Sequence, residues 1–198
     1  MNYGRSVHEV ARDLVGATLR HGLSAGRIVE VESYHQEEPA CHAFIGPRPR
    51  TEVLFGPPGF AYVYRSYGIH ALLNAVAEDD GVGAAVLIRA IEPLEGIELM
   101  RARRGVSRDL DLTNGPGKLT EALGIGLELN GADLERGPIR IEPRPADTRP
   151  PKTVLGPRIG ITKATDLPWR FCDATSHFVS RPWPDEMRRA AARERVRV

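Results

Sequence analysis

The sequence predicts a single mixed domain of the α+β class, in which helices flank a β-sheet core. Its 198 residues are 41% hydrophobic, which is enough apolar material for one compact core. Segments with the two-residue alternation of strands and segments with helical spacing both occur, separated by turns rich in Gly and Pro. We expect residues 1–186 to form this domain and residues 187–198, rich in Arg and Ala, to form a C-terminal tail that can adopt a frayed helix.

The beginning of the chain predicts one helix and two strands. Ser6 and Glu9 have the spacing of a capping box, and Gly16 is placed to end the helix. Residues 17–21 and 26–34 have the composition of two strands joined by a short turn.

The second of these strands carries two carboxylates and a phenol. Its alternation places Glu30, Glu32 and Tyr34 on one face and both Val29 and Val31 on the other. An unpaired carboxylate is costly to bury, so the acidic pair either lines a solvated face of the sheet or belongs to a functional site. The local sequence leaves both interpretations open.

The middle of the chain predicts a long loop, three strands and a helix. Residues 37–58 are rich in Pro, Gly and Arg, which is typical of a loop that is functional or mobile. Strands are expected over residues 60–64, 71–77 and 84–91, and a helix over residues 94–104.

The last third begins with another helix. Asn114 can cap it, with Pro116 in its first turn and Leu119 on its inner face. The segments that follow are expected to be strands over residues 138–142, 157–162 and 177–181, with a loop over residues 143–152.

A basic residue, Arg89, lies inside an otherwise apolar strand. Alternation divides this strand into two sets, Leu87, Arg89, Ile91 and Val86, Ile88, Ala90. An acid such as Glu32 and a base such as Arg89 on two inner strands suggest a polar centre at which a water molecule is held and polarised.

Three tyrosines, Tyr62, Tyr64 and Tyr67, fall within six residues, and alternation puts the first two on the same side. Core packing is the usual explanation for aromatic residues at this spacing. The alternative is a slot in which a planar base stacks, worth about 1–3 kcal/mol per base. A cationic alkylated purine would gain about 0.5–2 kcal/mol more per contact with a ring face.

Charge and cysteine content narrow the class of protein. The formal net charge is +1, so a surface that binds nucleic acid must be a local patch. Cys41 and Cys172 are too few for a disulfide framework, which favours a reducing, cytoplasmic environment. No apolar run approaches the length of a membrane span or a signal peptide, so neither membrane insertion nor export is expected.

Two kinds of site are excluded by their missing residues. Residues 115–118 are not a phosphate loop, because Leu112 and Leu119 stand where Gly and Ser or Thr are required. The two cysteines lie too far apart for a zinc deaminase, and the six histidines show no metal-binding spacing. The sequence therefore predicts no metal site and no phosphate-loop site for a nucleoside triphosphate.

Several short motifs follow one another along the chain. They are Gly26-Arg-Ile-Val-Glu-Val-Glu-Ser-Tyr34, then His42, Phe55-Gly-Pro-Pro-Gly59, Tyr62-Val-Tyr64-x-x-Tyr67-Gly68, Leu72-Leu-Asn74, Val86-Leu-Ile-Arg-Ala-Ile-Glu-Pro93 and Asn114-Gly-Pro-Gly-Lys-Leu119. In this order and spacing they resemble the alkyladenine (3-methyladenine) DNA glycosylase family. The resemblance extends from about Ser6 to about Trp183.

The resemblance implies a curved, mainly antiparallel sheet flanked by helices, and an enzyme that acts without metal or cofactor. It implies that Glu32 is the general base that activates a hydrolytic water and that Arg89 helps to hold this water. Tyr34 would stack on one face of a base turned out of the duplex, with His42 and Tyr64 on its other face.

Three more roles are implied in the same way. Tyr67 would be the wedge that fills the gap left in the duplex by the everted nucleotide. Asn74 would lie at the pocket wall, where its amide could clash with the exocyclic amine of normal guanine. Leu87 would line the pocket.

The implied activity is release of alkylated or deaminated purines from double-stranded DNA. The expected lesions are 3-methyladenine, 7-methylguanine, hypoxanthine and ethenoadenine, with the N-glycosidic bond hydrolysed to leave an abasic site. Strand cleavage would need an amine that forms a Schiff base. None of the three lysines, Lys118, Lys152 and Lys163, is expected in the pocket, so we predict hydrolysis only. We also expect a monomer without a membrane partner.

Three positions depart from the family pattern, namely Thr51, Leu54 and Arg65, and they leave the lesion range open. Arg65 either contacts a phosphate or alters the geometry of the wedge.

Two other classes of protein also fit parts of the sequence. A nucleic-acid-binding module with a stacking pocket would use the tyrosines but not Glu32 with Arg89. A hydrolase of free nucleosides would need neither Tyr67 as a wedge nor a basic rim such as Arg50, Arg65, Arg101 and Arg104.

Overall fold

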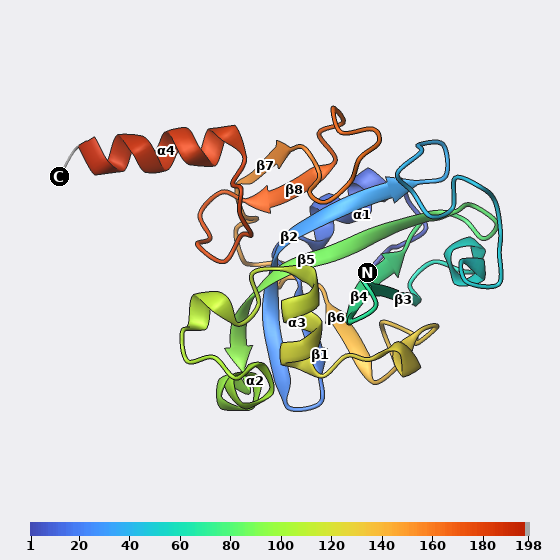
Figure 1. Cartoon of the computed structure of the whole chain (residues 1–198), viewed down its shortest axis with the longest axis horizontal. Coiled ribbons are helices and arrows are strands. Elements are labelled where there is room, and N and C mark those ends of the chain that lie inside the picture. Colours follow the sequence, from blue (N-terminus) through green and yellow to red (C-terminus); the bar gives the residue numbers. More distant parts are fainter. Residues whose placement is uncertain (197–198) are drawn as a thin grey trace.

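The computed structural model describes residues 1–196 and shows an α+β domain built on one antiparallel sheet (Figure 1). The helices and strands in chain order are α1 (Val7–Leu14), β1 (Thr18–His21), β2 (Ser24–His35), β3 (Ala61–Ser66), β4 (His70–Val76), β5 (Ala84–Glu95), α2 (Ile97–Arg104), α3 (Pro116–Leu123), β6 (Ile139–Glu142), β7 (Thr153–Gly156), β8 (Arg170–Asp173) and α4 (Asp185–Val196). Short 3₁₀ helices lie at Glu52–Phe55, Asp109–Asp111 and Leu127–Leu129. The predicted fold class is confirmed.

The strands β2 and β5 form the centre of the sheet. The strand order is β3-β4-β5-β2-β1-β6, and β8, which pairs with β7, also pairs with β2. The first part of β2 pairs with β1 and its later part with β8, so the sheet divides along this strand. Both long strands curve through the molecule in Figure 1, which brings the segments around β8 toward the later half of β2.

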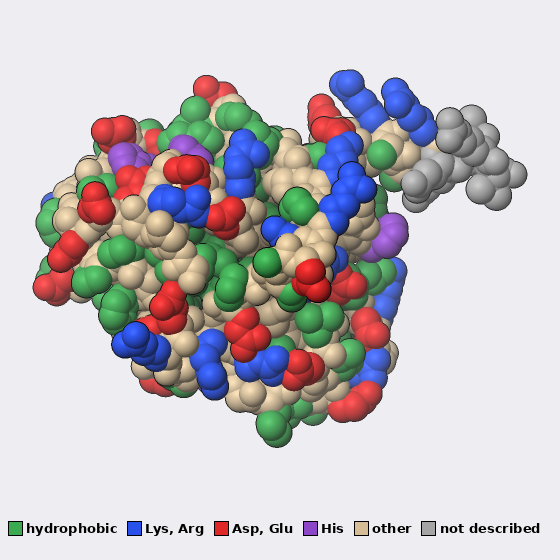
Figure 2. All heavy atoms as spheres, turned by 180° about the vertical axis from the view of Figure 1, so that it is seen from behind, with side chains coloured by type: hydrophobic (Ala, Val, Ile, Leu, Met, Phe, Trp, Pro, Cys, Tyr) green, Lys and Arg blue, Asp and Glu red, His purple; other side chains and the backbone are tan. Residues whose placement is uncertain are grey.

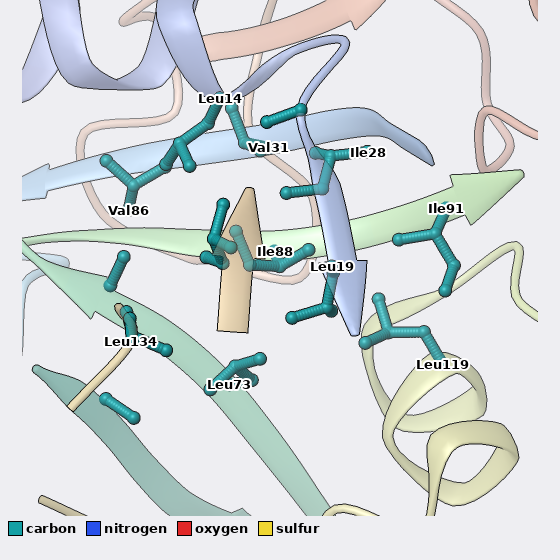
Figure 3. Close-up of a cluster of buried hydrophobic side chains, with 14 of the residues drawn as sticks. Leu14, Leu19, Ile28, Val31, Leu73, Val86, Ile88, Ile91, Leu119 and Leu134 are labelled. Carbon is teal, nitrogen blue, oxygen red and sulfur yellow. The ribbon is translucent and has the colours of Figure 1, made fainter. Parts of the chain in front are cut away.

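One apolar core joins helices α1 and α3 to the sheet. In Figure 3, Leu14 of α1 and Leu119 of α3 lie among strand residues that include Val31, Ile88 and Ile91. All five side chains are fully buried, and such burial stabilises the fold by about 1.5–3 kcal/mol per side chain.

Both helix caps predicted from the sequence are wrong in detail. Helix α1 does begin after Ser6, but the Ser6 hydroxyl makes no capping hydrogen bond. The Val7 amide donates instead to the carboxylate of Glu78 at 2.8 Å. Helix α3 follows Gly115, and the Asn114 side chain accepts a hydrogen bond from Lys118 Nζ at 2.7 Å. A tertiary contact therefore replaces the local cap at α1, and at α3 the Asn114 side chain binds Lys118 instead of capping the helix.

The predicted alternation fails where β2 meets β5. The register runs through the pairs Ile28–Ile91, Glu30–Ala90 and Val31–Ile88, so each strand has one extra residue, Val29 and Arg89 respectively. Such bulges reverse the facing of the residues beyond them. Val29 and Ala90 accordingly pack in a second cluster with Cys172, whereas Val31 and Ile91 belong to the main core.

Two predicted strands, over residues 157–162 and 177–181, are loops, and the strands of this region are β7 and β8. Backbone amides of both loops donate to carboxylates of β2 instead of to a neighbouring strand. The loops predicted over residues 37–58 and 143–152 are present, the first with one 3₁₀ turn.

The predicted helix over residues 94–104 starts later than expected. Strand β5 continues to Glu95, and Gly96 then takes a left-handed conformation with φ of 68°. A Cβ atom at this position would lie 2.5 Å from the Leu23 carbonyl oxygen, so only glycine fits.

Helix α4 projects from the body of the molecule in Figure 1 and contains described residues of the predicted tail. The last two residues of that tail, 197–198, lie outside the described residues. Figure 2 shows acidic and basic side chains interspersed on the far face, with basic ones gathered toward α4. Within the described part of the chain, no helix combines the length and the apolar character needed to cross a membrane.

Candidate active site

Two carboxylates of β2, Glu30 and Glu32, are completely buried, with 0% of each residue exposed. The alternative that they line a solvated face is therefore wrong. Glu30 accepts hydrogen bonds from Arg89 Nε and Arg170 Nε, both at 2.8 Å. It also accepts from the Ser180 amide at 2.7 Å and the Ser180 hydroxyl at 2.8 Å. Glu30 is thus a fully satisfied anchor that orients Arg89.

Glu32 receives three donors from three different segments. The Ile159 amide donates to Oε1 at 2.7 Å, and the Tyr34 hydroxyl donates to Oε2 at 2.8 Å. Arg89 Nη1 donates to Oε2 at 3.3 Å. The structure therefore brings together the acid and the base that the sequence placed on two inner strands.

These contacts offset part of the free-energy cost of burying Glu32 in its ionised form. Burial raises the pKa of Glu32 above its ordinary value, while Arg89, the Ile159 amide and the Tyr34 hydroxyl favour the ionised form. Burial and the adjacent carboxylate also raise the pKa of Tyr34. The phenol therefore keeps its proton and donates it in the hydrogen bond to Glu32.

A cavity of about 680 Å³ opens beside this centre. Seven predicted site residues are among those that line it, namely Tyr34, His42, Tyr64, Tyr67, Asn74, Leu87 and Arg89. The volume is typical of a site for a small organic ligand. Glu32 lies behind the wall, in contact with three lining residues, Tyr34, Arg89 and Ile159.

Aromatic rings form one part of the wall. The centroids of His42 and Tyr64 are 4.6 Å apart with an interplanar angle of 70°. Tyr62 stacks on Tyr64 at 5.4 Å, and its hydroxyl lies 3.1 Å from His42 Nδ1. Burial lowers the pKa of His42, so its ring is neutral at pH 7. The Asn74 amide donates to the Tyr62 carbonyl at 3.0 Å, which fixes its orientation at the wall.

Tyr67 lies at the tip of the β3–β4 hairpin, next to the cavity. It is 87% exposed and has a φ of 49°, an uncommon conformation for an aromatic residue. Ile69 of the same tip is 75% exposed. Arg65 donates to the Gly68 carbonyl at 3.1 Å, so this departure from the family pattern braces the tip.

The other two departures lie inside the fold. Thr51 is buried, and its hydroxyl oxygen accepts from the Arg48 amide at 3.1 Å. Leu54 is buried against the aromatic cluster and lines the cavity.

The predicted position of the lysines is wrong, because both Lys118 and Lys163 line the cavity. The two arginines of α2 that were expected at a basic rim, Arg101 and Arg104, form ion pairs with Asp109 and Glu121 respectively. Their charge is therefore partly neutralised within the protein.

The sequence did not reveal Arg170, Ser180 or the loop that carries Ile159. These groups lie far along the chain from β2, and no spacing rule connects them with Glu30 or Glu32. The one signal in the sequence that could have pointed to Arg170 is an arginine within the short strand β8. Among residues 1–196, no group of three His, Cys, Asp or Glu side chains could hold a metal ion.

The fold and the site together define a class of protein. An aromatic-lined cavity with a buried carboxylate and arginine at its wall suits an enzyme that hydrolyses a bond next to a planar base. The family described as Methylpurine-DNA glycosylase matches residues 1–177.

Similar proteins come from several organisms. One from Rhodopseudomonas palustris is 56% identical over 182 residues, covering 92% of this chain and 87% of its own length. Others are 55% identical in Bradyrhizobium diazoefficiens, covering 92% and 90%, and 49% identical in Methanoculleus marisnigri, covering 90% and 96%. All three bear the name "Putative 3-methyladenine DNA glycosylase". The chain belongs to the methylpurine-DNA glycosylase family and is thus a DNA glycosylase, a hydrolase of N-glycosyl bonds that acts on DNA.

Proposed function

We propose that this glycosylase flips alkylated or deaminated purines out of double-stranded DNA and releases them by hydrolysis alone. The expected substrates are 3-methyladenine, 7-methylguanine, hypoxanthine and ethenoadenine. The observation that carries the proposal is the buried carboxylate of Glu32, held by Arg89, Tyr34 and Ile159 beside an aromatic cavity. The names of the similar proteins support 3-methyladenine as one substrate.

Glu32 acts in this proposal as the general base. Cleavage of the glycosidic bond passes through an oxocarbenium-like sugar, which a nearby carboxylate stabilises while it orients the attacking water. Arg89, which lines the cavity and donates to Glu32, helps to hold this water. An alkylated, cationic base leaves readily and needs little acid catalysis.

The cavity suits a cationic purine. Tyr34 stacks on one face of the base, and Tyr64 and His42 contact the other, at about 1–3 kcal/mol per stacked base. Because burial lowers the pKa of His42, its neutral ring does not repel the positive charge of the base. Asn74 excludes normal guanine through a clash with its exocyclic amine, and Leu87 completes the pocket.

Tyr67 provides the wedge. Its exposed ring at a braced hairpin tip can enter the space from which the nucleotide has turned out. We propose that the protein acts as a monomer, without a cofactor, in the cytoplasm, where it associates with the nucleoid when bound to DNA.

The proposal is tested with duplex oligonucleotides that each carry one of the four lesions. Wild-type protein is expected to release at least one of them and to leave alkali-labile abasic sites without nicking the strand. Lys118, whose amine donates to Asn114, and the exposed Lys163 are expected to form no Schiff base. Borohydride trapping, with Lys118→Met and Lys163→Met as comparison variants, checks this expectation.

Three results would contradict parts of the proposal. Nicking without alkali, lost in one of the lysine variants, would show a lyase activity. Cleavage of free nucleosides as fast as of duplex substrate would favour a nucleoside hydrolase. Duplex binding without base release would indicate a binding module.

The pH dependence of the rate of base release should follow the ionisation of the Glu32 carboxyl group. The general base must be ionised, and its pKa is raised above the ordinary value of 4.5, so the rate falls as the pH drops through this raised value. The acidic limb is therefore expected at a higher pH than for an exposed glutamate. Single-turnover rates on 3-methyladenine duplex between about pH 4.5 and 8.5 measure it. A limb at or below the ordinary glutamate value would contradict this role.

A further inference from the structure

A second buried ion pair, Arg158 with Glu38, lies next to the site but does not line the cavity. Arg158 Nη1 and Nη2 donate to the two carboxylate oxygens of Glu38 at 2.6 and 3.0 Å. Only 0% and 6% of the two side chains are exposed. The pair joins the loop after β2 to the loop after β7, two segments that are 120 residues apart.

Arg158 also contacts the end of β2. Its Nη1 donates to the Ser33 carbonyl at 3.1 Å, and its guanidinium carbon lies 4.5 Å from the centroid of the Tyr34 ring. The same carbon lies 5.2 Å from the centroid of Trp169. Among residues 1–196, no hydrogen-bond partner faces the buried Nε of Arg158, so the Nη hydrogen bonds and the ring contacts hold its guanidinium.

The residues next to the pair contact the site directly. Ile159, one peptide beyond Arg158, lines the cavity and donates its amide to Glu32 at 2.7 Å. Glu38 also accepts from the amide of Ala40 at 2.8 Å, and Ala40 lines the cavity. The ion pair thus connects three parts of the site: the Ile159 amide that donates to Glu32, the ring of Tyr34, and the loop that carries His42.

We infer that Arg158 and Glu38 are positioning residues that hold the Ile159 amide and Tyr34 against Glu32. This inference depends on the proposed function, because it gives the pair a task in orienting the general base. A buried bidentate ion pair is costly to desolvate and tolerates little displacement, so it suits a position at which small movements change the rate. Neither residue touches the substrate.

The test uses Arg158→Lys, which keeps the charge but loses the bidentate geometry, and Glu38→Gln, which keeps the shape but loses the charge. The first measurement is hydrogen exchange of the peptide that contains residue 159, in protein without DNA. Faster exchange is expected in both variants, because the amide no longer stays on the carboxylate. This readout does not depend on enzymatic activity.

The second measurement is the single-turnover rate on 3-methyladenine duplex. Arg158→Lys is expected to lower the rate by about 100-fold, as a misplacement of roughly 1 Å can do. The dissociation constant for duplex with a stable abasic analogue should stay within about threefold, because the pair does not line the cavity. The double variant should be no slower than the slower single variant, because both changes break one interaction.

The third measurement separates positioning from a purely structural role. Loss of the Ile159 donor removes a contact that favours ionised Glu32, so the acidic limb of the rate profile should move to higher pH. The matched control is Arg20→Lys, in the Arg20–Glu95 pair, neither residue of which lines the cavity. This variant should leave the rate, the acidic limb of the rate profile and the hydrogen exchange unchanged.

The outcomes distinguish this inference from the proposed function. Wild-type protein that releases no base overturns the proposed function, whatever the exchange data show. An active wild type, together with folded Arg158→Lys and Glu38→Gln proteins that keep its rate, acidic limb and exchange, overturns the positioning role alone. Circular dichroism establishes that each variant is folded before it is compared.

Discussion

Glu32→Gln is expected to lower the single-turnover rate of base release by about 10²- to 10⁴-fold, the range that a general base contributes. Glutamine can still accept the Ile159 amide, and its amide group can donate to the Tyr34 hydroxyl oxygen. The pocket should therefore keep its shape, and binding of lesion-containing duplex should change little. Rate and dissociation constant are measured on the same oligonucleotide.

The control for this variant is Glu95→Gln, which alters an exposed carboxylate ion-paired with Arg20. Its rate should equal that of the wild type. A Glu32→Gln protein that retains a tenth or more of the wild-type rate would remove Glu32 from the reaction and, with it, the proposed mechanism.

Arg89→Met is expected to have the largest effect on stability, about 3–5 kcal/mol in the free energy of unfolding at pH 7. Arg89 is ion-paired with both Glu30 and Glu32, whose side chains are 0% exposed. Its removal leaves one guanidinium, that of Arg170, for two buried carboxylates. The measurement is urea-induced unfolding followed by circular dichroism.

The pH dependence of this loss has a defined sign. Burial raises the pKa of Glu32 in the folded state, and Arg89 opposes this rise. Without Arg89 the pKa of Glu32 rises further above its unfolded value, so the folded state binds this proton more tightly than the unfolded chain. The destabilisation should therefore shrink as the pH is lowered from 7 toward 5. Arg20→Met, at the exposed pair, should cost far less and show no such recovery. An equal loss at both pH values for Arg89→Met would contradict the proposed charge balance.

Much of the fold was predictable because its signals are local. The strands β1 to β6 and helices α1 to α3 follow from two-residue and helical periodicity, with ends that differ by a few residues. The predicted strands over residues 157–162 and 177–181 are loops, and in each of them one backbone amide, that of Ile159 or Ser180, donates to a buried carboxylate of β2. A carboxylate acceptor from another part of the chain leaves no periodic pattern in the loop that donates to it.

In the candidate site, too, some residues could be predicted from the sequence and others could not. The motif order placed Tyr34, His42, Tyr64, Asn74 and Leu87 in one pocket, and all five line the cavity. The lysines were misplaced because Lys118 and Lys163 reach the cavity through the start of α3 and a loop whose course was not predictable. Residues that support the site without belonging to a motif, above all Arg158 and Arg170, were not found at all.

The sequence by itself determined the α+β class, the approximate positions of strands β1 to β6, the family and the chemical types of the pocket residues. Only the tertiary structure decided that Glu30 and Glu32 are buried, that paired bulges turn Val29 and Arg89 out of alternation, and that Ile159 supplies a donor. The physical reason is the separation along the chain of the residues that interact. Periodicity reflects neighbours within one strand or helix, whereas the bond from Ile159 to Glu32 joins residues 127 positions apart. Such a bond forms only after the sheet has brought its two ends together.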